Sequence, residues 1–120
     1  MSEDVTRTVV RRHLDAWKRG DVPALLDDYA DDAVMLSAMA GVLSGKDAIG
    51  AMYGPVFDGL FPPADTMLEV TAEVIAEDHA LVHWTATTSK VRTVGGFDTF
   101  VLRDGKIAAQ SGGCEIVAID

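Results

Sequence analysis

The sequence is poor in several residue types, and each shortage excludes a class of protein. It has one cysteine, Cys114, so no internal disulfide can form, and no Cys/His spacing typical of a zinc site occurs. Ten basic residues against nineteen acidic ones leave a net charge of −9, which argues against nucleic acid or a membrane as partner. No apolar run approaches the roughly 18 residues of a membrane span, and the N-terminus does not resemble a signal peptide. We therefore expect a cytoplasmic protein.

The chain does contain enough apolar residues for one domain spanning residues 1–120. Hydrophobic residues make up 48% of it, and a chain of this length buries roughly two-thirds of its unfolded surface. Apolar residues at spacings of three and four predict a helix over residues 3–19, a short second helix after Asp21 and a third helix over 46–58. The nearly continuous apolar run at 33–39 predicts a short buried strand.

After residue 65 the apolar period changes to two, which predicts strands. Asp104 and Gly105 form a favoured two-residue hairpin turn, and Gly95 with Gly96 is expected to separate two strands. Helices followed by a meander of strands predict an α+β fold, with the helices on one face of a mostly antiparallel sheet. The expected strands cover the alternating segment with Leu68, Val70, Ala72 and Val74 buried, then residues 80–89, 96–103 and 106–119.

Three titratable residues stand out because they share a face with apolar neighbours. Asp98 shares one with Phe100, and the period alone leaves open whether that face meets the core or solvent. His13 lies on the apolar stripe of the first helix, one turn before Trp17, where a histidine is most often a core or rim residue. His83 lies on a stripe that faces either the interior or the outer side of the sheet.

Other polar residues carry weaker signals. Tyr29 and Tyr53 fall on the expected buried faces of the second and third helices, and a buried phenol usually needs a hydrogen-bond partner. Cys114 has no neighbouring base in the sequence, which favours a small core residue over a reactive thiol. Four acidic residues resemble a metal cluster but lack the spacing of an oxygen-ligand loop, so we expect them to be solvated; they are Asp27, Asp28, Asp31 and Asp32.

Four stretches together carry a family resemblance: His13 to Asp21, Tyr29 to Ala33, Ser44 to Ile49 and Phe97 to Ile107. They resemble the nuclear transport factor 2-like superfamily, most closely its SnoaL-like and ketosteroid isomerase-like branches, over about residues 5–118. The resemblance implies a cone, in which a curved sheet wraps around the first helix and encloses an apolar pocket. It also implies a homodimer.

The same resemblance suggests roles for individual residues. Asp98 falls where the isomerase keeps a protonated aspartic acid that donates to an oxyanion, and Tyr29 and Tyr53 fall where it has supporting phenols or an aromatic residue. The sequence departs from the isomerase at two positions. His13 replaces the oxyanion-donating tyrosine, and Ser37 stands near the place of the aspartate that serves as catalytic base.

These observations predict an acid–base enzyme, working without metal or cofactor, for a small apolar molecule that contains a carbonyl group or a ring. An isomerase, cyclase, dehydratase or hydrolase would fit. Asp98 and His13 are the expected catalytic pair, as a neutral pair or an ion pair, and His83 is the substitute base. The alternative is a non-catalytic binding or dimeric interaction domain, which the missing base favours; pairing of Asp98 with Arg103 or Lys106 at the surface would support it. The expected substrate-binding residues are Trp17, Tyr29, Ser37, Met39, Met52, Tyr53, Phe57, Thr85, Phe100, Gln110 and Cys114.

Overall fold

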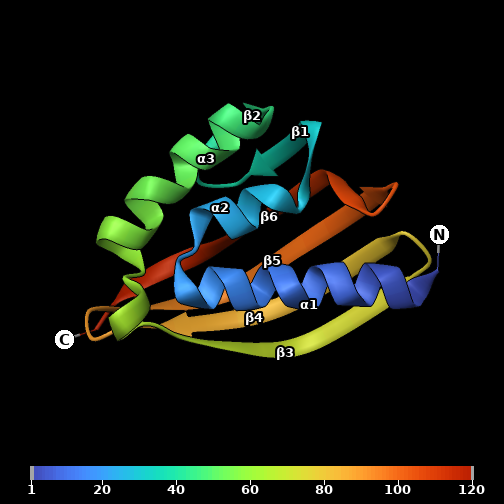
Figure 1. Cartoon of the computed structure of the whole chain (residues 1–120). Helices are drawn as coiled ribbons and strands as arrows, with labels where there is room; N and C mark the ends of the chain where they lie inside the picture. The colour runs from blue at the N-terminus through green and yellow to red at the C-terminus, as the bar shows by residue number, and fades with distance from the viewer. Residues whose placement is uncertain (1, 120) are drawn as a thin grey trace.

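A single strongly curved sheet forms one side of the molecule, and the helices lie on its concave side (Figure 1). The computed structural model describes residues 2–119. Six strands follow the order β2-β1-β6-β5-β4-β3, and every neighbouring pair is antiparallel except β1 and β6. The α+β prediction is therefore confirmed. The strands are β1 (Tyr29–Ser37), β2 (Gly41–Ser44), β3 (Met67–Ala76), β4 (His79–Thr87), β5 (Val91–Arg103) and β6 (Lys106–Ala118).

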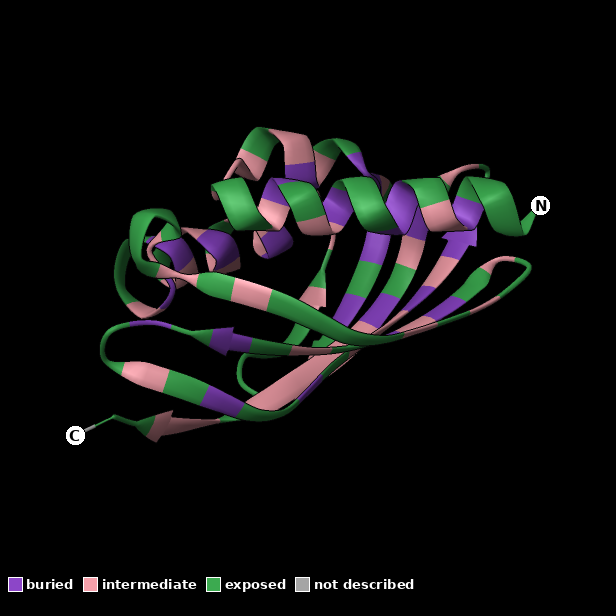
Figure 2. Ribbon diagram, turned by 90° about the horizontal axis from the view of Figure 1, so that it is seen from below, coloured by how far each residue is buried: buried purple, intermediate pink, exposed green. Residues whose placement is uncertain are grey.

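The long helix α1 (Glu3–Arg19) lies along the inside of the curve, where buried strand positions gather beneath it (Figure 2). Its start is capped by the Ser2 hydroxyl, which accepts the Val5 amide hydrogen at 3.3 Å. Its end is closed by Gly20 in the left-handed conformation, at φ 63°. The apolar stripe predicted from spacing is the buried face, so the helix at 3–19 is confirmed. Within the described range, no helix has the length and apolar character needed to cross a bilayer.

The other helical segments differ from their predicted bounds. Helix α2 (Val22–Asp27) ends before Tyr29, so Tyr29 begins β1 instead of lying on a helix. Helix α3 (Lys46–Pro55) continues as a π-helical turn over Val56–Leu60, followed by a short 3-10 turn at Pro63–Asp65. Because Pro55 has no amide hydrogen to donate, the regular α-helical hydrogen bonding cannot continue through it.

Two of the bulges in the sheet overturn predictions. Strand β3 shifts register between Val70 and Ala72, which reverses the face that later residues present. Val74 is therefore 59% exposed instead of buried, and Glu73 turns toward α1, where it pairs with Arg11 at 3.0 Å. Ala72 is likewise exposed.

The second bulge lies inside β5. Gly95 and Gly96 do not separate two strands, because β5 runs through them with a register shift between Val94 and Phe97. Gly95 has φ 67°, and a Cβ atom on Gly96 would collide with the backbone oxygen of Trp84 on the neighbouring strand. The hairpin at Asp104 and Gly105 is confirmed, with positive φ at both residues. Strand β2 was not predicted.

Candidate functional site

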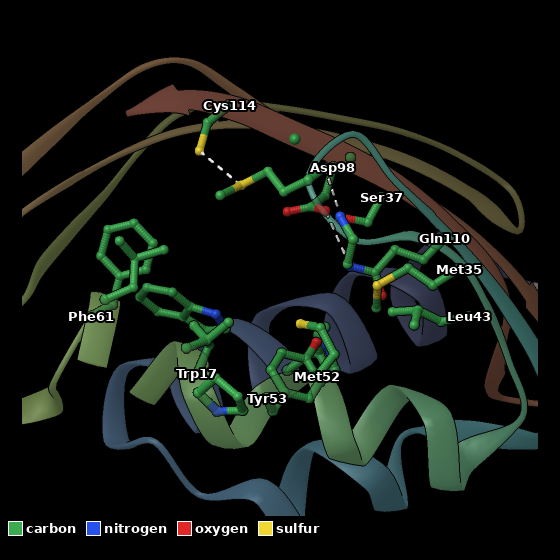
Figure 3. A pocket seen from close by; sticks show the side chains of 18 of the residues that line it. Trp17, Met35, Ser37, Leu43, Met52, Tyr53, Phe61, Asp98, Gln110 and Cys114 are labelled. Atoms are coloured by element: carbon green, nitrogen blue, oxygen red, sulfur yellow. Dashed lines mark hydrogen bonds between the residues drawn. The ribbon is translucent and has the colours of Figure 1, made fainter. Parts of the chain in front are cut away.

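A cavity of about 570 Å³ lies between the concave face of the sheet and helices α1 and α3 (Figure 3). Its lining is mainly apolar, and aromatic and sulfur-containing side chains form much of it. Among residues 2–119, the lining includes four titratable side chains: His13, Tyr53, Asp98 and Cys114. Large side chains around the cavity include Leu14, Trp17, Met35, Met52, Phe61 and Trp84.

Asp98 lies on β5, and its side chain points into the cavity (Figure 3). It carries the one carboxyl group that the described residues contribute to this lining. The Trp84 indole N–H donates to Asp98 Oδ2 at 2.9 Å, and the Gln110 amide N–H donates to Oδ1 at 3.1 Å. On the facing strand, Gly112 leaves the space that the carboxyl group occupies, since a Cβ atom there would overlap Asp98 Oδ1. The carboxyl group is thus held by two neutral donors in an apolar setting.

This setting changes the acidity of Asp98. Burial raises the pKa of Asp98 to about 6, although the hydrogen bonds from Gln110 and Trp84 lower it in part. Among the ion pairs formed by residues 2–119, none involves Asp98. Arg103 pairs instead with Asp32, and Lys106 donates to the backbone oxygen of Asp27 at 2.5 Å. A carboxyl group that titrates close to neutral pH can both accept and return a proton.

His13, from α1, is held by a second carboxylate that sequence reasoning misplaced. Its Nδ1 lies 3.1 Å from Asp28 Oδ2, and Arg12 donates to Asp28 Oδ1 at 2.8 and 2.6 Å. Burial alone would raise the pKa of Asp28, but hydrogen bonds from His13 and Arg12 outweigh it and lower the pKa. Asp28 is 1% exposed, so the prediction of a solvated side chain was wrong there, because the turn after α2 directs it beneath α1.

The rest of the acidic cluster fits the prediction. Asp27, Asp31 and Asp32 are exposed. Within residues 2–119, no group of three or more acidic, histidine or cysteine side chains is placed to hold a metal ion.

Tyr29 connects the His13 cluster to the pocket. Its hydroxyl lies 3.2 Å from His13 Nε2 and 2.8 Å from the Tyr53 hydroxyl, and it donates to Gln110 Oε1 at 2.5 Å. Burial raises the pKa of both phenols, which keeps them neutral at pH 7. Because Gln110 then donates to Asp98, one chain of hydrogen bonds runs from Asp28 to Asp98. No hydrogen bond between described residues joins His13 to Asp98 directly, so the expected catalytic pair is an indirect one.

The sequence left open which face of β4 meets the interior, and the structure places the face of His83 on the outside. Val82, Trp84 and Ala86 point inward, whereas His83 and Thr85 are exposed on the outer face. The role of His83 as a substitute base and that of Thr85 as a pocket residue are therefore wrong. Both faces of β4 are partly apolar, so the alternation of residues did not show which face is buried. For the same reason the sequence analysis did not identify Trp84 as a pocket residue.

Two further candidates lie behind the pocket wall. Tyr29 is 1% exposed and touches the cavity only through its partners. Phe57 stacks on Tyr53 with ring centroids 5.7 Å apart and packs edge-on against Trp17 at 5.4 Å. The other expected binding residues line the cavity, and their roles stay predictions: Trp17, Ser37, Met39, Met52, Tyr53, Phe100, Gln110 and Cys114.

Ser37 and Cys114 have local roles that the structure makes visible. The Ser37 hydroxyl accepts backbone amide hydrogens from Met39 and Ala40, at 3.2 and 3.0 Å, and so stabilises the turn after β1. Cys114 Sγ lies 3.8 Å from Met39 Sδ, and burial raises the pKa of the Cys114 thiol. The residue near the expected position of the family's catalytic base is thus a turn-stabilising hydroxyl.

Comparison with known proteins places the chain in a family. A model of the SnoaL-like domain matches residues 10–110. The chain belongs to the SnoaL-like domain family. Its fold resembles an NTF-2 like protein of unknown function from Burkholderia xenovorans, with a TM-score of 0.78 and 19% identity, covering 96% of this chain and 86% of the other. A comparison with curated proteins gives no match.

Two more similar structures have provisional functional names. One, from Kribbella flavida, is provisionally named a ketosteroid isomerase, with a TM-score of 0.78, 16% identity, and coverage of 98% of this chain and 82% of that one. The other, from Sinorhizobium meliloti, is provisionally named a polyketide cyclase, with a TM-score of 0.70, 24% identity, and coverage of 88% and 93%. At these identities the likeness shows the fold alone.

Proposed function

We propose that this SnoaL-like protein is an acid–base enzyme for a small, largely apolar molecule that contains a carbonyl group or a ring. Isomerase, cyclase, dehydratase and hydrolase reactions all fall within this proposal. The observation that carries it is the Asp98 carboxyl group, which faces an apolar cavity and has a pKa of about 6. Pockets that combine an apolar lining with a few placed polar groups and a perturbed acid are typical of active sites.

The proposed proton transfer begins with Asp98 as base, because a group with a pKa of about 6 is mostly ionised at pH 7. Its carboxylate takes a proton from the carbon next to the substrate carbonyl, and the electron pair of that C–H bond moves into the enolate. The protonated Asp98 then returns the proton to the same or another carbon. The neutral Tyr53 phenol lies on the wall of the same cavity. Because Tyr29 donates its hydrogen to Gln110, Tyr53 donates its own to Tyr29, and it would have to turn that hydrogen toward the enolate oxygen to stabilise it.

One carboxyl group serves both steps in this scheme. The isomerase branch uses a second aspartate near the place of Ser37. Here the Ser37 hydroxyl accepts two backbone hydrogen bonds in the turn after β1. His13 acts at a distance, since Asp28 and Tyr29 hold both of its ring nitrogens. We therefore assign Asp98 as the proton-transfer residue and propose that His13 supports it through Tyr29 and Gln110. The proposed chemistry requires no cofactor.

A hydrogen-exchange assay tests this proposal and does not require the natural substrate. A panel of small cyclic ketones is incubated with the protein in D₂O, and deuteration next to the carbonyl is followed by proton NMR. We expect exchange of at least one ketone above the buffer rate, and its loss in Asp98→Asn. The exposed Asp104→Asn variant, which removes the same charge, should retain it. Exchange that persists in Asp98→Asn would show that the carboxyl group is not the base.

A non-catalytic binding domain is the second candidate, and the Ser37 contacts favour it. A pocket that keeps an acid but lacks the expected base across from it could bind a ligand without turning it over. The two functions separate in one experiment: tight binding of a ketone, measured calorimetrically, with no deuterium exchange would support the binding domain.

We also propose a homodimer formed through the outer face of the sheet. Large apolar side chains on that face are exposed; they include Leu36 (53% exposed), Val42 (70%) and Phe97 (37%). An exposed apolar surface of this kind is typical of a protein–protein interface. Sedimentation at several concentrations tests the dimer, and Phe97→Asp should shift it toward monomer while leaving the inner pocket intact. A wild-type protein that sediments as a monomer throughout would refute it.

A further inference from the structure

Two carboxylates of this protein, the buried Asp28 and the half-buried Asp98, differ in whether a cation accompanies them. Asp28 is paired with the Arg12 guanidinium and with His13. Asp98 accepts hydrogen bonds only from the neutral Trp84 indole and the neutral Gln110 amide. The first charge is neutralised inside the fold, and the second is left without a counter-ion.

The residues around the cavity do not supply that counter-ion. The lining formed by the described residues contains no lysine and no arginine. His13 reaches the wall, but Asp28 and Tyr29 occupy its ring nitrogens. Removing a carboxylate from water is unfavourable unless a charge or several hydrogen bonds compensate it. The cavity therefore has a negative site that a positive group on a ligand would complete.

The surroundings of Asp98 also suit a positive group attached to an apolar body. Trp84, which holds the carboxyl group, has its ring centroid 6.5 Å from that of Trp17, and the Trp17 ring lies 5.5 Å from that of Phe61. Indole and phenyl faces attract cations, most strongly where water is excluded. The thioethers Met35 and Met52 are polarisable and adapt to apolar shapes. A net charge of −9 on the whole chain would also increase the local concentration of cations.

We infer that the pocket binds hydrophobic amines, with the protonated amine paired to the Asp98 carboxylate and the apolar body against the Trp17 and Trp84 side. This binding rests on the pocket geometry. Its consequence for turnover rests on the proposed function: an amine paired to Asp98 occupies the carboxylate that would accept a proton, so such amines inhibit the reaction.

Calorimetry with three probes of one shape tests the inference. The probes are naphthylmethylamine, which is cationic at neutral pH, naphthylmethanol, which is neutral, and naphthoate, which is anionic. We expect the amine to bind at least about tenfold more tightly than the alcohol, since a hydrogen bond between charged groups is roughly twice as strong as one between neutral groups. Naphthoate should bind most weakly.

Two variants show whether Asp98 is the counter-ion. Asp98→Asn keeps the shape and removes the charge, so the amine should lose its advantage while the affinity of the alcohol stays within about threefold. Asp104→Asn removes the same charge from an exposed turn and should keep the advantage. Equal binding of amine and alcohol to the wild type, no detectable amine binding, or an advantage that survives in Asp98→Asn would each overturn the inference.

A measurement on the wild type covers the case in which Asp98→Asn does not fold. The carboxyl carbon of Asp98 is followed by NMR across pH, with His13, Tyr53 and Cys114 as the other titratable groups of the wall and with Tyr29 and Asp28 behind it. The amine should lower the pKa of Asp98, and the alcohol should not. An unchanged pKa in saturating amine would refute the pairing.

These results are separable from the proposed function. If amines bind through Asp98 but no ketone exchanges deuterium, the ligand inference stands and the enzyme proposal fails. If Asp98-dependent exchange occurs and amines neither bind nor inhibit, the enzyme proposal stands and the ligand inference fails.

Discussion

Replacing Asp98 by asparagine should make the protein more stable at neutral pH, which is unusual for a buried polar residue. The folded-state pKa of about 6 lies above the ordinary value of 3.8, so the charged form is less favourable in the fold than in the unfolded chain. The difference of about two pKa units corresponds to about 3 kcal/mol against folding above pH 6. Solvent in the pocket screens part of this, because Asp98 is only half-buried.

The sign of the pH dependence follows from the direction of the shift. Because the folded-state pKa is raised, the Asp98 contribution to stability is most favourable at low pH, where the group is protonated in both states. That contribution is lost as pH rises from about 4 to about 6. Asparagine removes this dependence. Its amide N–H₂ also faces a donor, Trp84 or Gln110, which costs about 1 kcal/mol at every pH.

Urea denaturation of wild type and Asp98→Asn at several pH values between about 4 and 8 measures this difference. We expect the variant to be less stable by about 1 kcal/mol near pH 4 and more stable by about 1–2 kcal/mol near pH 8. Asp104→Asn serves as the control for the change in net charge, since its side chain is exposed. Parallel pH dependences of wild type and Asp98→Asn would refute the reasoning, because they would show that burial does not disfavour the charge.

Three further predictions concern the groups around Asp98. Gln110→Met removes an N–H that lowers the pKa of Asp98, so that pKa should rise, as measured by carboxyl-carbon NMR; an unchanged or lower value would contradict the assigned contact. Asp28→Asn leaves the Arg12 guanidinium without its carboxylate partner, and it should cost about 2–4 kcal/mol in urea denaturation near pH 7. The cost should be smaller as pH falls, because the folded-state pKa of Asp28 is lowered. Gly112→Ala should crowd the Asp98 carboxyl group and lower the midpoint of urea denaturation, at a cost of about 1–3 kcal/mol. Gly54→Ala is the control and should not lower the midpoint, because no atom lies near its Cβ position. Equal effects of the two substitutions would exclude the steric argument.

Local patterns in the sequence predicted those elements whose stability is mainly local. Helix α1 has its cap at Ser2, its apolar stripe and its glycine stop within one continuous segment, so its bounds matched. The hairpin at Asp104 and Gly105 matched because two residues with positive φ specify the turn. Elements that depend on distant partners were predicted poorly, as the unexpected strand β2 and the helical placement of Tyr29 show.

The sequence predicted only part of the candidate site. The apolar neighbours of Asp98 left open whether its face meets the core or solvent, and only the family resemblance suggested an apolar pocket. Neither revealed the donors, which come from β4 and β6. His83 and Trp84 are adjacent in the chain, and only the register of β4 against β5 decides which of them faces inward. Which residues of β3 face inward depends in the same way on a bulge, and the alternation of residue types does not predict that bulge.

By itself, the sequence determined the fold class, the position of the long helix and the presence of an acidic group among apolar residues, because periodicity and turn chemistry act over a few neighbouring residues. Only the tertiary structure decided that Asp28 is buried against His13 and Arg12, and that Asp98 has two neutral donors and no cation. Those facts depend on which side chains meet across strands and helices far apart in the chain. Burial and pairing at such meeting points set the charge of each carboxyl group, and with it the chemistry proposed for the pocket.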